Sequence, residues 1–201
     1  MNAIYSVTER TRVRRRPQRA AYDHETVHAI LDAGIVCQVG FVDAGRPVVI
    51  PTIYARIGET VVFHGASRSR TLLAAGSGVD LCFTVTLLDG LVLARSAFHH
   101  SANYRSVVAF GRARLVEDRE AKTEALRAFT ERLNPGRWAV VRPPTDAELQ
   151  ATSVLELPLE EVSAKVRSGG PIDDEEDYAL PVWAGVIPLS LEAGTPIPDS
   201  R

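Results

Sequence analysis

The sequence predicts a mainly β protein, an antiparallel β-barrel with peripheral helices. From residue 35 onward, short apolar and β-branched segments follow one another and are separated by turns that contain glycine. The strand–helix–strand alternation of a parallel sheet is absent, and so are the GxGxxG and GxxxxGK[ST] motifs of nucleotide-binding α/β folds. Six or more short strands joined by hairpins, with a few inserted helices, therefore favour a barrel over a Rossmann fold.

The first elements are an arginine-rich segment and a helix. Residues 1–21 are polar and carry six arginines between positions 10 and 19, so we expect a peripheral arm. Such an arm can bind phosphate backbones electrostatically, but it lacks the aromatic residues on which bases stack, and nucleic acid is not favoured as a partner. An N-cap at Asp23 and apolar residues at Ile30 and Leu31 predict a helix that Gly34 ends.

The remaining elements follow from turn and capping signals. Strands are expected at residues 35–42, 47–57, 60–63, 79–88, 91–98, 104–116, 152–157 and 161–167. Asp89-Gly90 is a strong hairpin signal between two of these segments. Helices are expected at residues 71–75, from Asp118 to about Leu133, and after the capping-box pattern of Thr145 and Glu148. We divide the chain into an arm of residues 1–21, a barrel domain of residues 22–190 and a C-terminal tail of residues 191–201.

Composition excludes several classes of protein. No apolar run approaches the ~20 residues that span a bilayer, and no apolar signal-peptide core follows the first residues, so we expect a cytoplasmic protein. The net charge of −2 gives the whole chain no bias toward nucleic acid. Cys37 and Cys82 lie far apart in apolar β segments, which excludes a disulfide framework and a cysteine-rich zinc site.

The segment from Phe63 to Arg70 is the first that can carry chemistry. Two arginines, two hydroxyl side chains and a glycine lie between a predicted strand and a predicted helix. Unpaired backbone N–H groups at a helix N-terminus favour an anion, and arginine adds bidentate bonds to phosphate. We therefore expect a phosphate site here; the alternative is that Ser67 or Ser69 caps the helix of a surface loop.

Two further segments offer contacts to a flat ligand. Between residues 98 and 106, a loop is expected to place Tyr104 and Arg105 against an aromatic ligand, with a plain surface turn as the alternative. The adjacent histidines there would point to opposite faces of a strand and no HExxH motif occurs, so no metal site is predicted. In segment 47–57, Pro47 and Pro51 leave neighbouring backbone groups without hydrogen-bond partners in a sheet. These groups could bind the polar edge of a flat heterocycle; the alternative is an ordinary edge strand.

Taken in order, these three segments resemble the pyridoxamine-phosphate-oxidase-like family of FMN-binding split β-barrel proteins. The resemblance is to the flavin-nucleotide-binding or nitroimidazole-resistance-like branch and covers about residues 22–190. The motifs that carry it are HGA…SR at residues 64–70 and NYRSVVAFG at residues 103–111. It implies a six-stranded antiparallel barrel of Greek-key type, and a homodimer with FMN bound at the subunit interface.

The resemblance also implies which residues bind the cofactor. They are Val49, Ile50, Pro51, Thr52, His64, Gly65, Arg68, Ser69, Arg70, Tyr104, Arg105, Ser106 and Trp183. Residues 49–52 would contact the isoalloxazine edge through their backbone, residues 68–70 would hold the phosphate, and residues 104–106 would flank the pocket. Trp183 would approach from the second chain; on local grounds it is either a stacking lid or a core plug for the tail.

The function expected from these features is FMN-dependent oxidation or reduction of a small molecule. His64 and Tyr104 are the candidates for proton delivery. The alternative is a binding protein without turnover that holds a flavin nucleotide, a deazaflavin or a haem, with His64, His99 or His100 as axial ligand. The Arg-x-His that ends true pyridoxamine-phosphate oxidases has no counterpart here, so oxidation of vitamin B6 is not expected.

Overall fold

The computed structural model of the chain describes residues 3–67, 69, 72 and 77–200. The chain groups into two compact units, each described by itself below. Unit 1 contains Met1–Leu87 and Ser106–Lys165, and unit 2 contains Leu88–Arg105 and Val166–Arg201. The helix expected at residues 71–75 lies outside the described residues except for Leu72.

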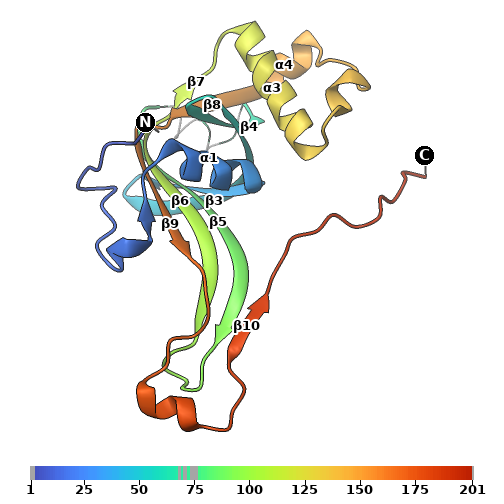
Figure 1. Cartoon of the computed structure of the whole chain (residues 1–201). Coiled ribbons are helices and arrows are strands. Elements are labelled where there is room, and N and C mark those ends of the chain that lie inside the picture. Colours follow the sequence, from blue (N-terminus) through green and yellow to red (C-terminus); the bar gives the residue numbers. More distant parts are fainter. Residues whose placement is uncertain (1–2, 68, 70–71, 73–76, 201) are drawn as a thin grey trace. The chain divides into compact units, whose positions relative to one another are not determined.

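The mainly β, antiparallel fold that the sequence predicts is confirmed (Figure 1). The helices are η1 (Pro17–Arg19), α1 (His24–Ala33), α3 (Arg119–Leu133), η2 (Arg137–Ala139), α4 (Asp146–Ala151) and η3 (Glu175–Ala179). The strands are β1 (Ala20–Ala21), β2 (Val36–Asp43), β3 (Arg46–Ile57), β4 (Thr60–Ala66), β5 (Asp80–Leu93), β6 (Ser101–Arg112), β7 (Arg114–Leu115), β8 (Thr152–Pro158), β9 (Glu161–Arg167) and β10 (Gly185–Pro188).

In the described part of the chain, ten strands form one sheet. The order is β1-β9-β6-β5-β2-β3-β4-β8-β7, and β10 pairs with β5. The short strands β1 and β10 are additional to the strands that the sequence indicates, and the strand expected at residues 104–116 is divided into β6 and β7. Strand β3 changes partner along its length: residues 46–53 pair with β2, and residues 54–57 pair with β4. One strand therefore belongs to two curved parts of the sheet.

The core of unit 1 forms where the alternating apolar residues of these strands meet. Tyr54, Phe63 and Phe83 are fully buried, and the rings of Tyr54 and Phe83 pack edge to face with centroids 5.2 Å apart. Helix α1 begins after the N-cap Asp23, as predicted, and buries Ile30 among its apolar residues. A second buried cluster joins Phe129 and Ala125 of α3 to residues of β3, β4 and β8.

Strand β4 is longer than the sequence predicts. The sequence predicts that this strand ends at Phe63, but β4 continues to Ala66. The reason is its partner, since His64 pairs with Val154, and the next two residues continue the same register along β8. The first residues of the HGA motif are therefore fixed in a strand.

The hairpin predicted at Asp89-Gly90 is wrong, because β5 continues through both residues to Leu93. Gly90 pairs with Pro188 of β10, and a Cβ at Gly90 would lie 2.9 Å from Val186 Cγ1. The glycine thus permits close packing of β10 instead of a turn. Residues 91–98 consequently form no separate return strand, and Tyr104 and Arg105 lie within β6 rather than in a loop.

The N-terminal arm is docked on unit 1. Tyr5 and Thr11 are buried, and Ala20–Ala21 pairs with Ala164 and Lys165 of β9. Arg10 lies 3.3 Å from Glu161 and its guanidinium stacks over an aromatic ring. No helix among the described residues is long and apolar enough to cross a bilayer.

Candidate functional site

His64 lies near the end of β4 in a largely apolar environment. Its ring centroid is 4.4 Å from that of Phe129 on α3. Among the described residues, its buried Nδ1 has no hydrogen-bond partner. Burial lowers the pKa of the imidazole, so the ring is neutral near pH 7. An unsatisfied buried polar atom costs about 1–3 kcal/mol, and a neutral imidazole can bond through both nitrogens, so a partner is expected here.

A close turn follows the end of β4 at Ala66. A Cβ at Gly65 would lie 2.8 Å from Leu72 Cδ1, so the glycine permits a close approach. The N–H of Ser67 donates to the carbonyl of Ala151, and the N–H of Ser69 donates to that of Ala66, each over 2.8 Å. These two N–H groups are therefore occupied. Arg68 and Arg70, which the sequence predicts to hold a phosphate, lie outside the described residues.

Residues 49–52 lie in the first half of β3. They pair with β2, from Val49 opposite Gly40 to Thr52 opposite Cys37. The pairing of β3 with β4 begins only at Tyr54, so the other edge of residues 49–52 has no strand partner in the described ranges. Val49 is 63% exposed. This edge is available to a ligand, as the two prolines suggest; the role of Ile50 and Pro51 stays a prediction.

The other predicted pocket residues are divided between the units. Tyr104, Arg105 and Trp183 belong to unit 2, whereas Ser106 belongs to unit 1, where its Oγ donates to the carbonyl of Lys165. The Arg105 guanidinium binds both carboxylate oxygens of Asp89, at 2.9 and 2.7 Å, and this raises its pKa. Arg105 is thus engaged within its own unit. Trp183 is 65% exposed.

The three histidines weighed as axial ligands differ in their surroundings. His99 Nε2 lies 3.2 Å from the carboxylate of Asp174, and His100 Nδ1 accepts a hydrogen bond from the N–H of Ala94. His64 alone among them has a buried ring nitrogen without a partner in the described part of the protein. It is therefore the best placed of the three to bind a group that the chain itself does not contain.

Sequence reasoning missed two features. Phe129 covers the His64 ring, yet it lies on a helix far along the chain and no local pattern links the two. The structure also brings His24, His28 and Glu59 together within 4.8 Å. The four-residue spacing of the two histidines was visible in the sequence, since it places both on one helix face. No signal indicated Glu59.

Comparisons with known proteins add independent findings. The family model described as Pyridoxamine 5'-phosphate oxidase matches residues 23–166. The solved structure of the flavocytochrome Anf3 from Azotobacter vinelandii is 48% identical with a TM-score of 0.91, covering 96% of this chain and 90% of that one. The FAD and heme binding protein from Mycobacterium smegmatis is 38% identical with a TM-score of 0.87, covering 90% of this chain and 89% of that one.

A more distant structure has the same fold. It is a candidate 5-nitroimidazole antibiotic resistance protein from Bacteroides thetaiotaomicron, 21% identical with a TM-score of 0.62. The match covers 73% of this chain and 86% of the other. No curated protein sequence matches the chain.

Proposed function

Since this chain belongs to the pyridoxamine 5'-phosphate oxidase family, we propose that it binds a flavin nucleotide and a haem and acts as an oxidoreductase on a small molecule. Two proteins similar to it over at least 90% of its length support both cofactors by their names, a flavocytochrome and an FAD and heme binding protein. The second name makes FAD a candidate beside the FMN that the sequence motifs imply.

One observation in this structure carries the haem part of the proposal. The buried Nδ1 of His64 lacks a partner among the described residues, and the ring is neutral near pH 7. A neutral imidazole is the form that ligates haem iron. Phe129 packs against the ring and limits the access of water to it. The residues present therefore fit the group, and the His64 imidazole would hold its iron.

The flavin would be held by other segments of the same unit. The open edge of residues 49–52 would bind the ring edge through its backbone, and Arg68, Ser69 and Arg70 would hold the phosphate. When bound, the flavin supplies hydride transfer and the haem supplies one-electron chemistry, while the protein orients both. We further propose a homodimer that holds the flavin between its protomers, with Trp183 of the second protomer approaching it.

The absorbance spectrum of the freshly purified full-length protein tests the proposal. Flavin bands and a Soret band are expected, and the mass of the nucleotide released by heat distinguishes FMN from FAD. A protein without flavin bands that also fails to take up added FMN or FAD would contradict flavin binding.

Variants then test the assigned residues. His64→Leu should remove the Soret band and keep the flavin bands, which also reports that the variant is folded. His99→Gln and His100→Gln are the matched controls and should keep both spectra; a Soret band that persists in His64→Leu would refute this ligand. Arg68→Ala and Arg70→Ala should each weaken flavin binding at least tenfold, given about 1.5–3 kcal/mol for a charge-assisted bond.

A further inference from the structure

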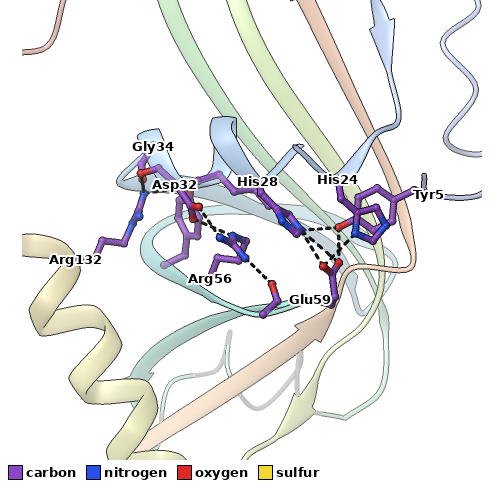
Figure 2. Close-up of polar contacts among 11 residues, drawn as sticks. Tyr5, His24, His28, Asp32, Gly34, Arg56, Glu59 and Arg132 are labelled. Carbon is purple, nitrogen blue, oxygen red and sulfur yellow. Dashed lines mark hydrogen bonds and ion pairs between the residues drawn. The ribbon is translucent and has the colours of Figure 1, made fainter. Parts of the chain in front are cut away.

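Three segments of unit 1 that are distant in sequence meet at one carboxylate. His24 and His28 lie one turn apart on the same face of α1, and Glu59 lies in the turn between β3 and β4. Tyr5 comes from the docked N-terminal arm. Figure 2 shows the two imidazoles and the phenol directed at the Glu59 carboxylate.

The distances match those of a metal-ligand set. Glu59 Oε1 lies 3.1 Å from His24 Nδ1 and 3.2 Å from His28 Nε2. In a tetrahedral zinc site with bonds of about 2.0–2.1 Å, neighbouring ligand atoms are about 3.3 Å apart. The ligand atoms of the three residues all lie within 4.8 Å of one another. After small rotations of the side chains, these three ligand atoms could therefore coordinate one ion.

We propose that His24, His28 and Glu59 bind a divalent transition metal, with Zn²⁺ as the best-fitting ion. Two imidazoles and one carboxylate, with water in the fourth position, form a ligand set that zinc takes in proteins. The site uses none of the residues assigned to the flavin or the haem. It would tie the start of α1 to the β3–β4 turn.

Access and charge both favour a cation here. The side chains of His24 and His28 are 26% and 21% exposed, and that of Glu59 is 53% exposed, so an ion can reach the ligand atoms from solvent. The Arg56 guanidinium interacts electrostatically with Glu59, but its hydrogen bonds go to both oxygens of Asp32 and to the carbonyl of Gly58. The hydrogen-bonding partners of the Glu59 carboxylate are therefore the two histidines and Tyr5, not an arginine.

Tyr5 is not one of the proposed metal ligands, but its hydroxyl orients the Glu59 carboxylate. Its hydroxyl donates to Glu59 Oε2 over 2.7 Å and lies 3.0 Å from His28 Nε2. Burial and the neighbouring carboxylate raise the pKa of Tyr5, so the hydroxyl keeps its proton and acts as a donor. Such a hydrogen bond orients a ligating carboxylate, and its loss typically weakens metal binding tenfold to a hundredfold.

Calorimetric titration of the full-length protein with ZnCl₂, after removal of metals by a chelator, tests the site. One Zn²⁺ per chain is expected, together with a rise in the melting temperature. His24→Ala, His28→Ala and Glu59→Gln should each weaken the affinity at least tenfold, and Tyr5→Phe by about tenfold. His99→Ala is the matched control, because His99 belongs to another histidine–carboxylate cluster, with Asp174 and Asp177; it should leave the affinity unchanged.

Two results would overturn the proposal. One is no heat of binding with Zn²⁺ up to millimolar concentration and no change in melting temperature. The other is binding of one Zn²⁺ whose affinity is the same in Glu59→Gln as in the natural protein. Glu59→Gln keeps the size of the side chain, so it carries the test if a histidine variant fails to fold. Zinc is measured independently of the flavin and haem spectra, so the two proposals fail separately.

Discussion

The C-terminal end of α1 is held by two side chains from elsewhere in unit 1, Tyr54 and Arg132; Figure 2 shows Arg132 beside Gly34. The Tyr54 hydroxyl donates to the carbonyl of Leu31 over 2.5 Å. Arg132 donates to the same carbonyl and to that of Asp32, each over 2.8 Å, and also to the carbonyl of Gly34. Carbonyls in the last turn of a helix have no intrahelical partner, so these side chains satisfy them. We predict that Tyr54→Phe and Arg132→Met are energetically coupled.

The expected magnitudes follow from the partners that each variant leaves. In Tyr54→Phe, the Leu31 carbonyl keeps Arg132, so the free energy of unfolding should fall by about 1 kcal/mol. In Arg132→Met, the same carbonyl keeps the tyrosine while two others lose a charged donor, which costs about 2–3 kcal/mol. In the double variant, Leu31, which is fully buried, loses both partners. The loss should exceed the sum of the single losses by about 1–2 kcal/mol.

Urea unfolding of the natural protein, both single variants and the double variant measures this coupling. Each kcal/mol should lower the melting temperature by about 2–4 °C in a domain of this size. Losses that add to within about 0.5 kcal/mol would refute the reasoning, because they would show that the two side chains do not share the Leu31 carbonyl.

Three further predictions concern the helices. Gly34→Ala places a methyl group 2.6 Å from the buried Val85 Cγ1, so urea unfolding should show a loss of about 1–3 kcal/mol; an unchanged midpoint would mean that the core relaxes. The pKa of Glu148 is lowered to about 2, first by its bond from Arg142, so its stabilisation is present above its ordinary pKa of 4.5 and is lost as the pH falls toward 2. The gap in melting temperature between Glu148→Gln and the natural protein should therefore shrink over that range, and a constant gap would contradict the assignment. Asp23→Ala removes the N-cap of α1 and should cost about 1 kcal/mol in the same urea assay, whereas full stability would show that the cap is dispensable.

Features that depend on neighbouring residues were predictable from the sequence. The caps at Asp23, Asp118 and Thr145 each place a side-chain oxygen on a backbone N–H a few residues later, and all three begin helices as expected. The Asp89-Gly90 signal failed because the partner that decides its conformation, Pro188, lies far along the chain. A local turn preference is weak against a row of interstrand bonds.

In the candidate site, too, some features were predictable from neighbouring residues and others depend on residues far along the chain. The HGA motif made His64 a candidate site residue, but the length of β4 depends on β8, and the packing over the His64 ring depends on Phe129. The four-residue spacing of His24 and His28 is a local property of one helix, whereas Glu59 reaches them only after β3 and β4 are paired. The spacing of residues within one helix or strand can be read from a sequence. Contacts between residues of separate helices and strands cannot.

The pairing of β1 with β9 has a consequence for the newly made chain. Ala20–Ala21 finds its partners about 140 residues later, in Ala164 and Lys165. At synthesis rates of about 5–20 residues per second, the ribosome needs roughly 7 to 28 s to deliver them. During that interval Ala20–Ala21 lacks the strand with which it pairs in the folded protein. The pairing of β1 with β9 can thus form only after most of the chain has been translated, so the last part of the arm to dock waits for a strand near the C-terminal end of unit 1.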